Sequence, residues 1–256
     1  MAVIHSHVGA NRLEERRRAS LLRRLSPGAI VSLLVFLVLC VPLIVPGWLA
    51  PYDPTAVSPS EIFQQPSIHH WLGTDQYGRD MLSRLIYGTR ISMSLGVVSV
   101  SLSVLISLPL GVVSGYYRGT LDSVLMRLMD VVMAFPGILL ALIIIAILGP
   151  GLANAMIAVG IGEAPAYTRV VRSATLSVRA QSYIEAARAI GANDFRILLR
   201  YVLPNVIQPL IVISSVGFAV AIVIGSSLGF LGLGAQPPTA EWGTMVSEGR
   251  TYLRSQ

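Results

Sequence analysis

Long apolar stretches alternate with polar ones along the chain, and their lengths predict membrane-spanning helices. A helix needs about 20 residues to cross the roughly 30 Å hydrocarbon core of a bilayer. Five stretches meet or approach that length, at residues 28–49, 91–117, 126–148, 152–168 and 206–233. Polar segments occupy residues 50–90 and 169–205, after a basic start at residues 1–27. The pattern predicts an all-α integral membrane protein with about five spans.

Within the second polar segment, apolar residues follow helical spacing twice, which predicts two short amphipathic helices. We expect Gly191 to form a left-handed turn between them, Asn193 or Asp194 to cap the second helix, and Pro204 to end it. Spacing alone fits either a helical pair that fills a groove on a water-soluble partner or a linker lying on lipid headgroups. The two series are Tyr183, Ala186, Ala187 and Ile190, then Phe195, Leu198, Leu199, Val202 and Leu203.

Composition supports the membrane assignment and excludes one kind of site. Of the 256 residues, 54% are hydrophobic and 12% are charged, whereas about 25% are charged in soluble domains. The net charge of +6 comes from Arg alone, because the sequence has no Lys. A P-loop holds phosphates with a Lys, so this chain carries no such nucleotide site.

The Arg residues cluster beside apolar segments, which indicates membrane topology rather than nucleic-acid binding. With the amino-terminal end in the cytoplasm, fourteen of the 19 Arg residues lie on the cytoplasmic side. The four His residues and the single Cys40 suggest neither a metal site nor an intrachain disulfide. We find no catalytic constellation in the sequence.

A stripe of small residues recurs every four positions in the second predicted span. Such a stripe lets helices approach closely in lipid, either for ordinary packing or for sliding beside a translocation path. A proline also occurs in each predicted span, which is compatible with a transport path. The stripe is Ser99, Ser103, Ser107, Gly111 and Gly115, and the prolines are Pro42, Pro109, Pro136, Pro165 and Pro209.

Glu163 is an acidic residue near one end of the fourth predicted span. Charges inside spans are costly and are functional candidates. We expect Glu163 to pair with Arg169 or with a partner subunit. One alternative is that it serves as the proton site of an ion-coupled secondary transporter, although no inverted repeat is evident. Another alternative is a membrane scaffold that transports nothing.

Three motifs together resemble the permease subunits of bacterial ABC importers. Glu185-Ala186-Ala187, Gly191 and Leu203-Pro204 resemble their cytoplasmic loop. Leu72-Gly73-Thr74-Asp75 and Gly78-Arg79-Asp80 resemble the extracytoplasmic segment of the dipeptide and oligopeptide branch. Ser226 to Gly234, Gln236-Pro237-Pro238 and Glu241-Trp242-Gly243 resemble peptide, nickel and glutathione importers. By pattern, we expect residues 71–86 to form an interfacial helix in which Asp75 and Arg79 are solvated and contact no substrate.

The resemblance implies the transmembrane-domain fold of a type I ABC importer in a bacterial plasma membrane, with residues 28–256 as one permease domain. The loop at 169–205 would carry the coupling helix that docks on an ATPase. Further partners implied are a second, similar permease and an extracytoplasmic solute-binding protein. No cofactor is expected on this chain, with ATP and Mg on the ATPase subunits. The coupling residues implied are Glu185, Ala186, Ala187, Arg188, Gly191, Leu203 and Pro204.

Two further expectations concern the substrate and the number of spans. Di- or oligopeptides are the expected solutes, and nickel chelates, glutathione or haem-like ligands are the alternatives. Glu185 is expected to pair with Arg188 or with a basic group of the partner. Family members usually have a sixth helix after the Glu241 region, whereas this sequence stops at Gln256. We therefore expect either an incomplete chain or a partner that covers the gap.

Overall fold

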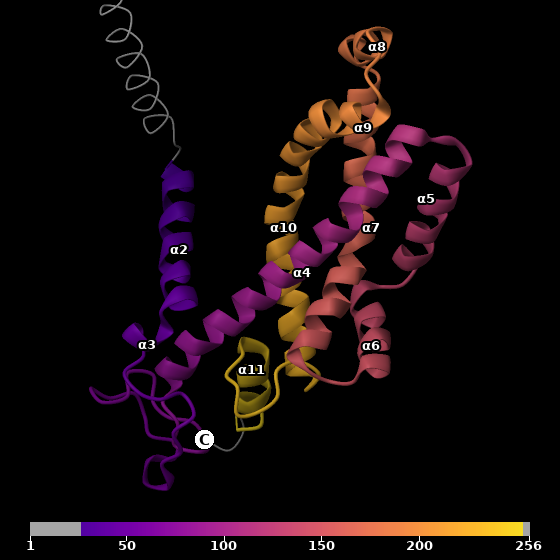
Figure 1. Cartoon of the computed structure of the whole chain (residues 1–256). Coiled ribbons are helices and arrows are strands. Elements are labelled where there is room, and N and C mark those ends of the chain that lie inside the picture. Colours follow the sequence, from indigo (N-terminus) through magenta and orange to yellow (C-terminus); the bar gives the residue numbers. More distant parts are fainter. Residues whose placement is uncertain (1–26, 253–256) are drawn as a thin grey trace, which may run out of the picture.

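The computed structural model describes residues 27–252 and builds them around long helices (Figure 1). The basic segment predicted at residues 1–27 lies, except for Pro27, outside the described residues. The elements are α2 (Pro27–Ile44), α3 (Pro46–Leu49), the 3-10 turn η1 (Pro59–Glu61), α4 (Met81–Tyr117), α5 (Gly119–Met133), α6 (Gly137–Leu148), α7 (Leu152–Arg179), α8 (Ser182–Ala189), α9 (Asp194–Ile197), the π-helix η2 (Leu198–Val202), α10 (Leu203–Phe230) and α11 (Trp242–Arg250).

Helix α4 runs obliquely from one end of the molecule to the other (Figure 1). Its first residues lie beside α3 and the segment 50–80, and its last turn lies near α9. Asp80 caps its start, because the Asp80 carboxylate accepts a 2.8 Å hydrogen bond from the backbone N–H of Ser83. The helix therefore begins at Met81, and residues 71–80 form turns instead of the predicted interfacial helix.

The small-residue stripe of α4 packs against α7. The Ser99 hydroxyl donates to the carbonyl of Met156 at 3.0 Å, and the Ser103 hydroxyl donates to that of Gly160 at 2.8 Å. All five residues of the stripe are buried. A Cβ atom at Gly111 would lie 2.6 Å from Val171 Cβ. The stripe therefore serves helix packing within this chain, which is the first of the two predicted roles.

Residues 126–148, predicted as one span, do not form a single continuous helix. They are divided between α5 and α6, which are bent by 90° at a short break. The break falls at Pro136, whose ring disfavours helical conformation in the preceding residue. Two ion pairs hold α5 against α7. Arg172 binds Asp122 through Nε at 2.6 Å and a second nitrogen at 2.7 Å, and Arg169 binds Asp130 at 2.6 Å.

The prediction that Pro204 ends a helix is wrong, because the chain continues from α9 through η2 into α10. Pro204 lies in the first turn of α10, directly after the π-helical turn. A single π turn shifts the backbone hydrogen bonds by one residue, so a proline without an N–H is accommodated there. Likewise, α7 does not stop at the predicted residue 168 but continues to Arg179.

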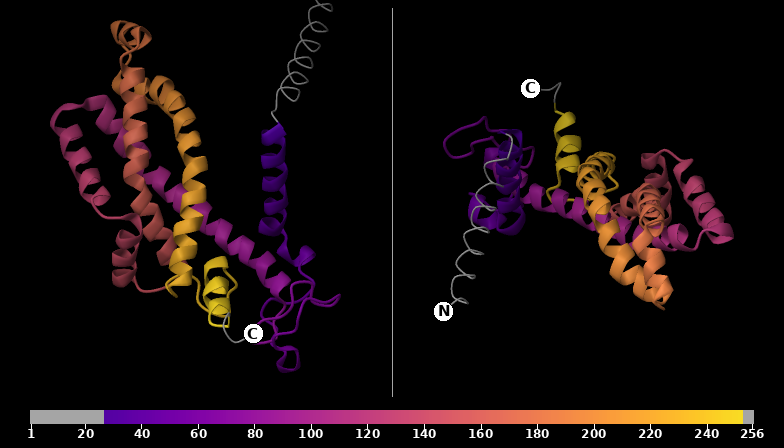
Figure 2. Two further views of the ribbon diagram at one scale, coloured as in Figure 1. Left: turned by 180° about the vertical axis from the view of Figure 1, so that it is seen from behind. Right: turned by 90° about the horizontal axis from the view of Figure 1, so that it is seen from above.

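By length and hydropathy, two helical stretches among residues 27–252 are able to cross a membrane. They are α4 and the run from Asp194 to Phe230, and the bent pair α5–α6 adds a third if it counts as one span. These criteria select fewer stretches than the five predicted spans, in part because polar residues in α7 lower its hydropathy. Figure 2 shows that α2 stands apart from α7 and α10, and its contacts are mainly with α3 and α4. The five-span topology stays a prediction.

We predict that Gly111→Ala destabilises the bundle. The added methyl group would lie 2.6 Å from Val171 Cβ and 2.8 Å from the Thr168 carbonyl oxygen, and overpacking of this kind costs about 1–3 kcal/mol. The midpoint of thermal unfolding in detergent should fall. Gly162→Ala is the matched control, since its nearest neighbour would be Leu140 Cδ2 at 3.8 Å. Equal midpoints for the two variants would show that the close approach of α4 and α7 is unimportant.

Candidate functional site

The candidate site is the pair of short helices α8 and α9, which lie at one end of the molecule (Figure 1). Gly191 makes the turn between them with a φ of 85°. The N–H of Ala192 bonds the Ala187 carbonyl at 3.0 Å, and the N–H of Gly191 bonds the Arg188 carbonyl at 2.9 Å. These two bonds form a Schellman motif. The predicted left-handed turn at Gly191 is confirmed.

The start of α9 also follows the sequence prediction. Asn193 is its N-cap, and its side-chain oxygen accepts a 2.9 Å hydrogen bond from the N–H of Arg196. Of the two predicted caps, Asn193 therefore fills the role. Asp194 occupies the first turn of α9, and its carboxylate makes a different contact.

Helix α8 has one face against the bundle and another facing outward. Ile184 and Ala187 are buried, and Ile184 belongs to the buried apolar cluster at this end. We call Tyr183, Ala186 and Ile190 the α8 ridge, and all three are exposed, Ile190 by 85%. Ala187 was predicted to share this stripe but faces inward instead. The ridge leaves apolar surface open to a partner, and Phe195 on α9 adds to it with 70% exposure.

Tyr116, in the last turn of α4, ties both short helices to the bundle. Its hydroxyl accepts a 2.9 Å hydrogen bond from the Arg188 guanidinium and donates one to the Asp194 carboxylate. The Arg188 guanidinium also lies 5.4 Å from the centre of the Tyr116 ring. The hydrogen bond with Tyr116 is the main reason that the pKa of Arg188 is raised above its ordinary value, so this guanidinium stays charged. We call this set of three residues the Tyr116 junction.

The structure places the predicted coupling residues in two groups. Glu185, Ala186, Ala187, Arg188 and Gly191 come together on α8 and its turn. Leu203 and Pro204 lie in α10 instead. The expected ion pair between Glu185 and Arg188 does not form, because the Arg188 side chain reaches Tyr116. Sequence reasoning missed Tyr116 and assigned Asp194 only a capping role.

At the opposite end, the motif containing Asp75 and Arg79 builds a buried ion network. Arg79 binds Asp75 at 2.7 Å, and both Arg79 and Arg84 bind Glu248 of α11, at 3.2 and 2.8 Å. The Arg84 side chain is 1% exposed. The expectation of a solvated turn is therefore wrong for these residues. Two carboxylates balance two guanidiniums, so the network is neutral and its burial is less costly.

His70 and Asp80 extend the same end of the structure. The buried His70 places Nδ1 2.9 Å from an Asp80 oxygen, while the other Asp80 oxygen caps α4. The neighbouring His69 is exposed. Between residues 27 and 252, no cluster of three or more His, Cys, Asp or Glu side chains is arranged to hold a metal ion.

Glu163 is half-buried on α7 and does not pair with Arg169, which binds Asp130 instead. The predicted Glu163–Arg169 pair is therefore wrong within this chain. Among the described residues, Glu163 has neither an ion-pair partner nor a hydrogen-bond partner. Pairing with a partner subunit stays a prediction.

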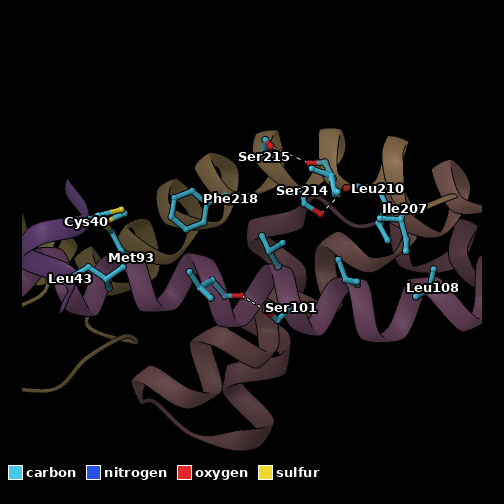
Figure 3. A pocket seen from close by; sticks show the side chains of 14 residues that line it. Cys40, Leu43, Met93, Ser101, Leu108, Ile207, Leu210, Ser214, Ser215 and Phe218 are labelled. Atoms are coloured by element: carbon cyan, nitrogen blue, oxygen red, sulfur yellow. Dashed lines mark hydrogen bonds between the residues drawn. The ribbon is translucent and has the colours of Figure 1, made fainter. Parts of the chain in front are cut away.

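A groove of about 780 Å³ runs between α2, α4 and α10 (Figure 3). Its walls are apolar apart from three serines, whose hydroxyls bond carbonyls of their own helices. Ser101 donates to Val97, Ser214 to Leu210 and Ser215 to Ile211, at 2.7 to 3.0 Å. Apart from the thiol of Cys40, which is a weak donor, the groove offers neither a charge nor a free donor to a polar solute, and it suits apolar chains better.

Long apolar helices, two of which are able to cross a membrane among the described residues, place the chain among helical membrane proteins. Residues 107–253 match the family described as the binding-protein-dependent transport system inner membrane component. The chain belongs to this family of ABC importer permeases.

Two relatives show where the chain lies within the family. It is 45% identical to the glutathione transport system permease protein GsiD of Pectobacterium atrosepticum, over 80% of this chain and 69% of that protein. It is 44% identical to the dipeptide transport system permease protein DppC of Alkalihalophilus pseudofirmus, over 77% of this chain and 65% of that protein.

The fold of the chain is similar to that of a transporter of known structure. The inward-facing methionine ABC transporter MetNI aligns with a TM-score of 0.58 and 23% identity, over 68% of this chain and 82% of that chain. This likeness concerns the fold alone. The predicted transmembrane-domain fold of a type I importer is confirmed.

We predict that Glu248→Gln destabilises the α11 end. The change leaves Arg79 and Arg84 with Asp75 as their one remaining carboxylate in the network, and loss of a charged hydrogen bond costs about 1.5–3 kcal/mol. Thermal unfolding in detergent measures the effect. Glu61→Gln is the control, because that carboxylate is 40% exposed and lies 3.8 Å from His70 Nε2. A drop of similar size in the control would refute the special role of Glu248.

Proposed function

We propose that this chain is the permease subunit of an ATP-driven importer and that α8 docks on the ATPase subunit. The observation that carries the proposal is the α8 ridge, which is apolar and exposed although the helix beneath it is fixed to the bundle. A short helix of this kind fits a groove on a water-soluble protein. Because the sequence has no Lys and hence no P-loop, ATP and Mg would be held by the partner.

The proposed orientation puts α8 in the cytoplasm, where an ATPase is found. Fourteen of the 19 Arg residues then lie on the cytoplasmic side, as the positive-inside rule requires. The amino terminus is cytoplasmic in this arrangement, and the segment 50–80 and α11 face outward. A solute-binding protein would deliver substrate to that outer face, and a second permease would complete the path.

We propose short peptides as the substrate class. The relatives' names give glutathione and dipeptides, and both are small molecules with peptide bonds and free carboxylates. Short peptides as a class therefore include both of the solutes that the relatives' names give. An ion-coupled mechanism through Glu163 is the alternative, and it differs in needing no ATPase.

Ile190→Glu should abolish capture of the ATPase subunit by the full-length protein in detergent. A carboxylate in the ridge would have to be desolvated on docking, at a cost of several kcal/mol. Ile68→Glu is the matched control, since Ile68 is 86% exposed against 85% for Ile190 but lies in the segment 50–80. Loss of capture by Ile68→Glu alone would show that the opposite membrane orientation is correct. Unchanged capture by both variants would refute docking through α8.

Gly191→Val should abolish ATP-driven uptake while membrane insertion is retained. The φ of 85° is strained for a β-branched residue, at about 1–2 kcal/mol, whereas a Cβ there would meet no atom within 4 Å. Gly191→Asn is the control, because Asn enters the left-handed region readily. Uptake into proteoliposomes containing the whole complex measures both. Normal uptake by the valine variant would count against the role of this turn.

A further inference from the structure

We propose that Tyr116 is the positioning residue through which movement of α8 and α9 is passed to α4. The inference rests on the proposed docking of α8, and it adds a route from the docking site into the membrane bundle. Tyr116 itself is 2% exposed and would not touch the ATPase. It would act through Arg188 and Asp194.

The Tyr116 hydroxyl is chemically suited to join two helices. It accepts a hydrogen bond from Arg188 on α8 and donates one to Asp194 on α9. A hydroxyl is able to do both at once, and its two partners carry opposite charges, which strengthens both bonds. Phenylalanine would keep the ring in place and lose both bonds.

The ring of Tyr116, like its hydroxyl, contacts residues on the neighbouring helices. The guanidiniums of Arg179 and Arg188 lie 5.8 and 5.4 Å from the ring centre, within the range of cation–π attraction. The ring also belongs to the buried cluster that includes Ile184 of α8 and Ile197 of α9. A displacement of α8 therefore acts on Tyr116 through apolar, cation–π and hydrogen-bonded contacts.

Tyr116 lies where α4 packs tightly against α7. Its neighbour Gly115 lies so close to α7 that a Cβ there would be 2.7 Å from Thr175 Cβ and 2.8 Å from the Arg172 carbonyl oxygen. Further along α4, Arg84 is bound to Glu248 of α11. A push on Tyr116 is thus carried by a continuous helix to the face opposite the docking site.

The test compares Tyr116→Phe with Tyr117→Phe in the complete importer, reconstituted with its ATPase and binding protein. Tyr117 is the matched control, since it follows Tyr116, is 52% exposed and packs edge-on against the Tyr116 ring at 5.2 Å. A single thiol at Ile190→Cys, in a Cys40→Ser background, reports docking by cross-linking to the ATPase. Uptake per ATP hydrolysed reports transmission.

Tyr116→Phe should keep the cross-link and ATP hydrolysis but lower uptake per ATP by about tenfold or more, because both charged hydrogen bonds of the hydroxyl are lost and the loss of even one accounts for about that factor. Tyr117→Phe should match the unmodified protein. Asp194→Asn added to Tyr116→Phe should cause little further loss, because both changes break one junction. Unchanged uptake per ATP in Tyr116→Phe, or additive losses in the double variant, would overturn the proposal.

Two further outcomes separate this inference from the proposed function. Loss of the cross-link in Tyr116→Phe would overturn the inference alone, by showing that Tyr116 merely holds the docking surface in shape. Absence of any cross-link in the unmodified Tyr116 background would overturn docking through α8, and with it the inference.

Discussion

The close contact between α4 and α7 is the constraint on which the rest of the structure depends. Lipid gives helices no hydrophobic reason to associate, so packing and hydrogen bonds must do so. Here Ser99 and Ser103 bond carbonyls across the interface, and Gly111 and Gly115 remove the side chains that would keep the helices apart. Helices α4 and α7 are consequently in close contact from Ser99 to Gly115 of α4, and we call this packed pair the α4–α7 unit.

Two charged clusters lie at opposite ends of this unit. At the α11 end, Arg79 and Arg84 are balanced by Asp75 and Glu248 in a buried network. At the α8 end, the Tyr116 junction combines one cation, one anion and a neutral hydroxyl. Each set is close to neutral, which limits the desolvation cost of burial. Between the two clusters, serines of α4 bond backbone carbonyls of α7, and α7 also carries Glu163 and the Arg169–Asp130 pair.

The sequence was informative wherever a few neighbouring residues decide the conformation. Gly191 and Asn193 are local signals of a turn and a cap, and both were predicted correctly. Contacts between distant residues gave no such signal: Arg84 and Glu248 are 164 positions apart, and Tyr116 and Arg188 are 72 apart. The prediction for Pro204 failed because a π turn, which the sequence pattern does not reveal, lets the helix continue.

That π turn gives α8 and α9 a second connection to the rest of the bundle. Tyr116 links them to α4 by side chains, whereas η2 links α9 to α10 through the backbone itself. The two routes meet again beyond α10, where the buried Glu241 accepts hydrogen bonds from Ser92 of α4 at 3.3 Å and Ser226 of α10 at 3.2 Å. The same carboxylate caps α11 through the N–H groups of Gly243 and Thr244. Helices α4 and α10 are therefore joined at both ends, so a displacement that starts at α8 must move them together or break one of these contacts.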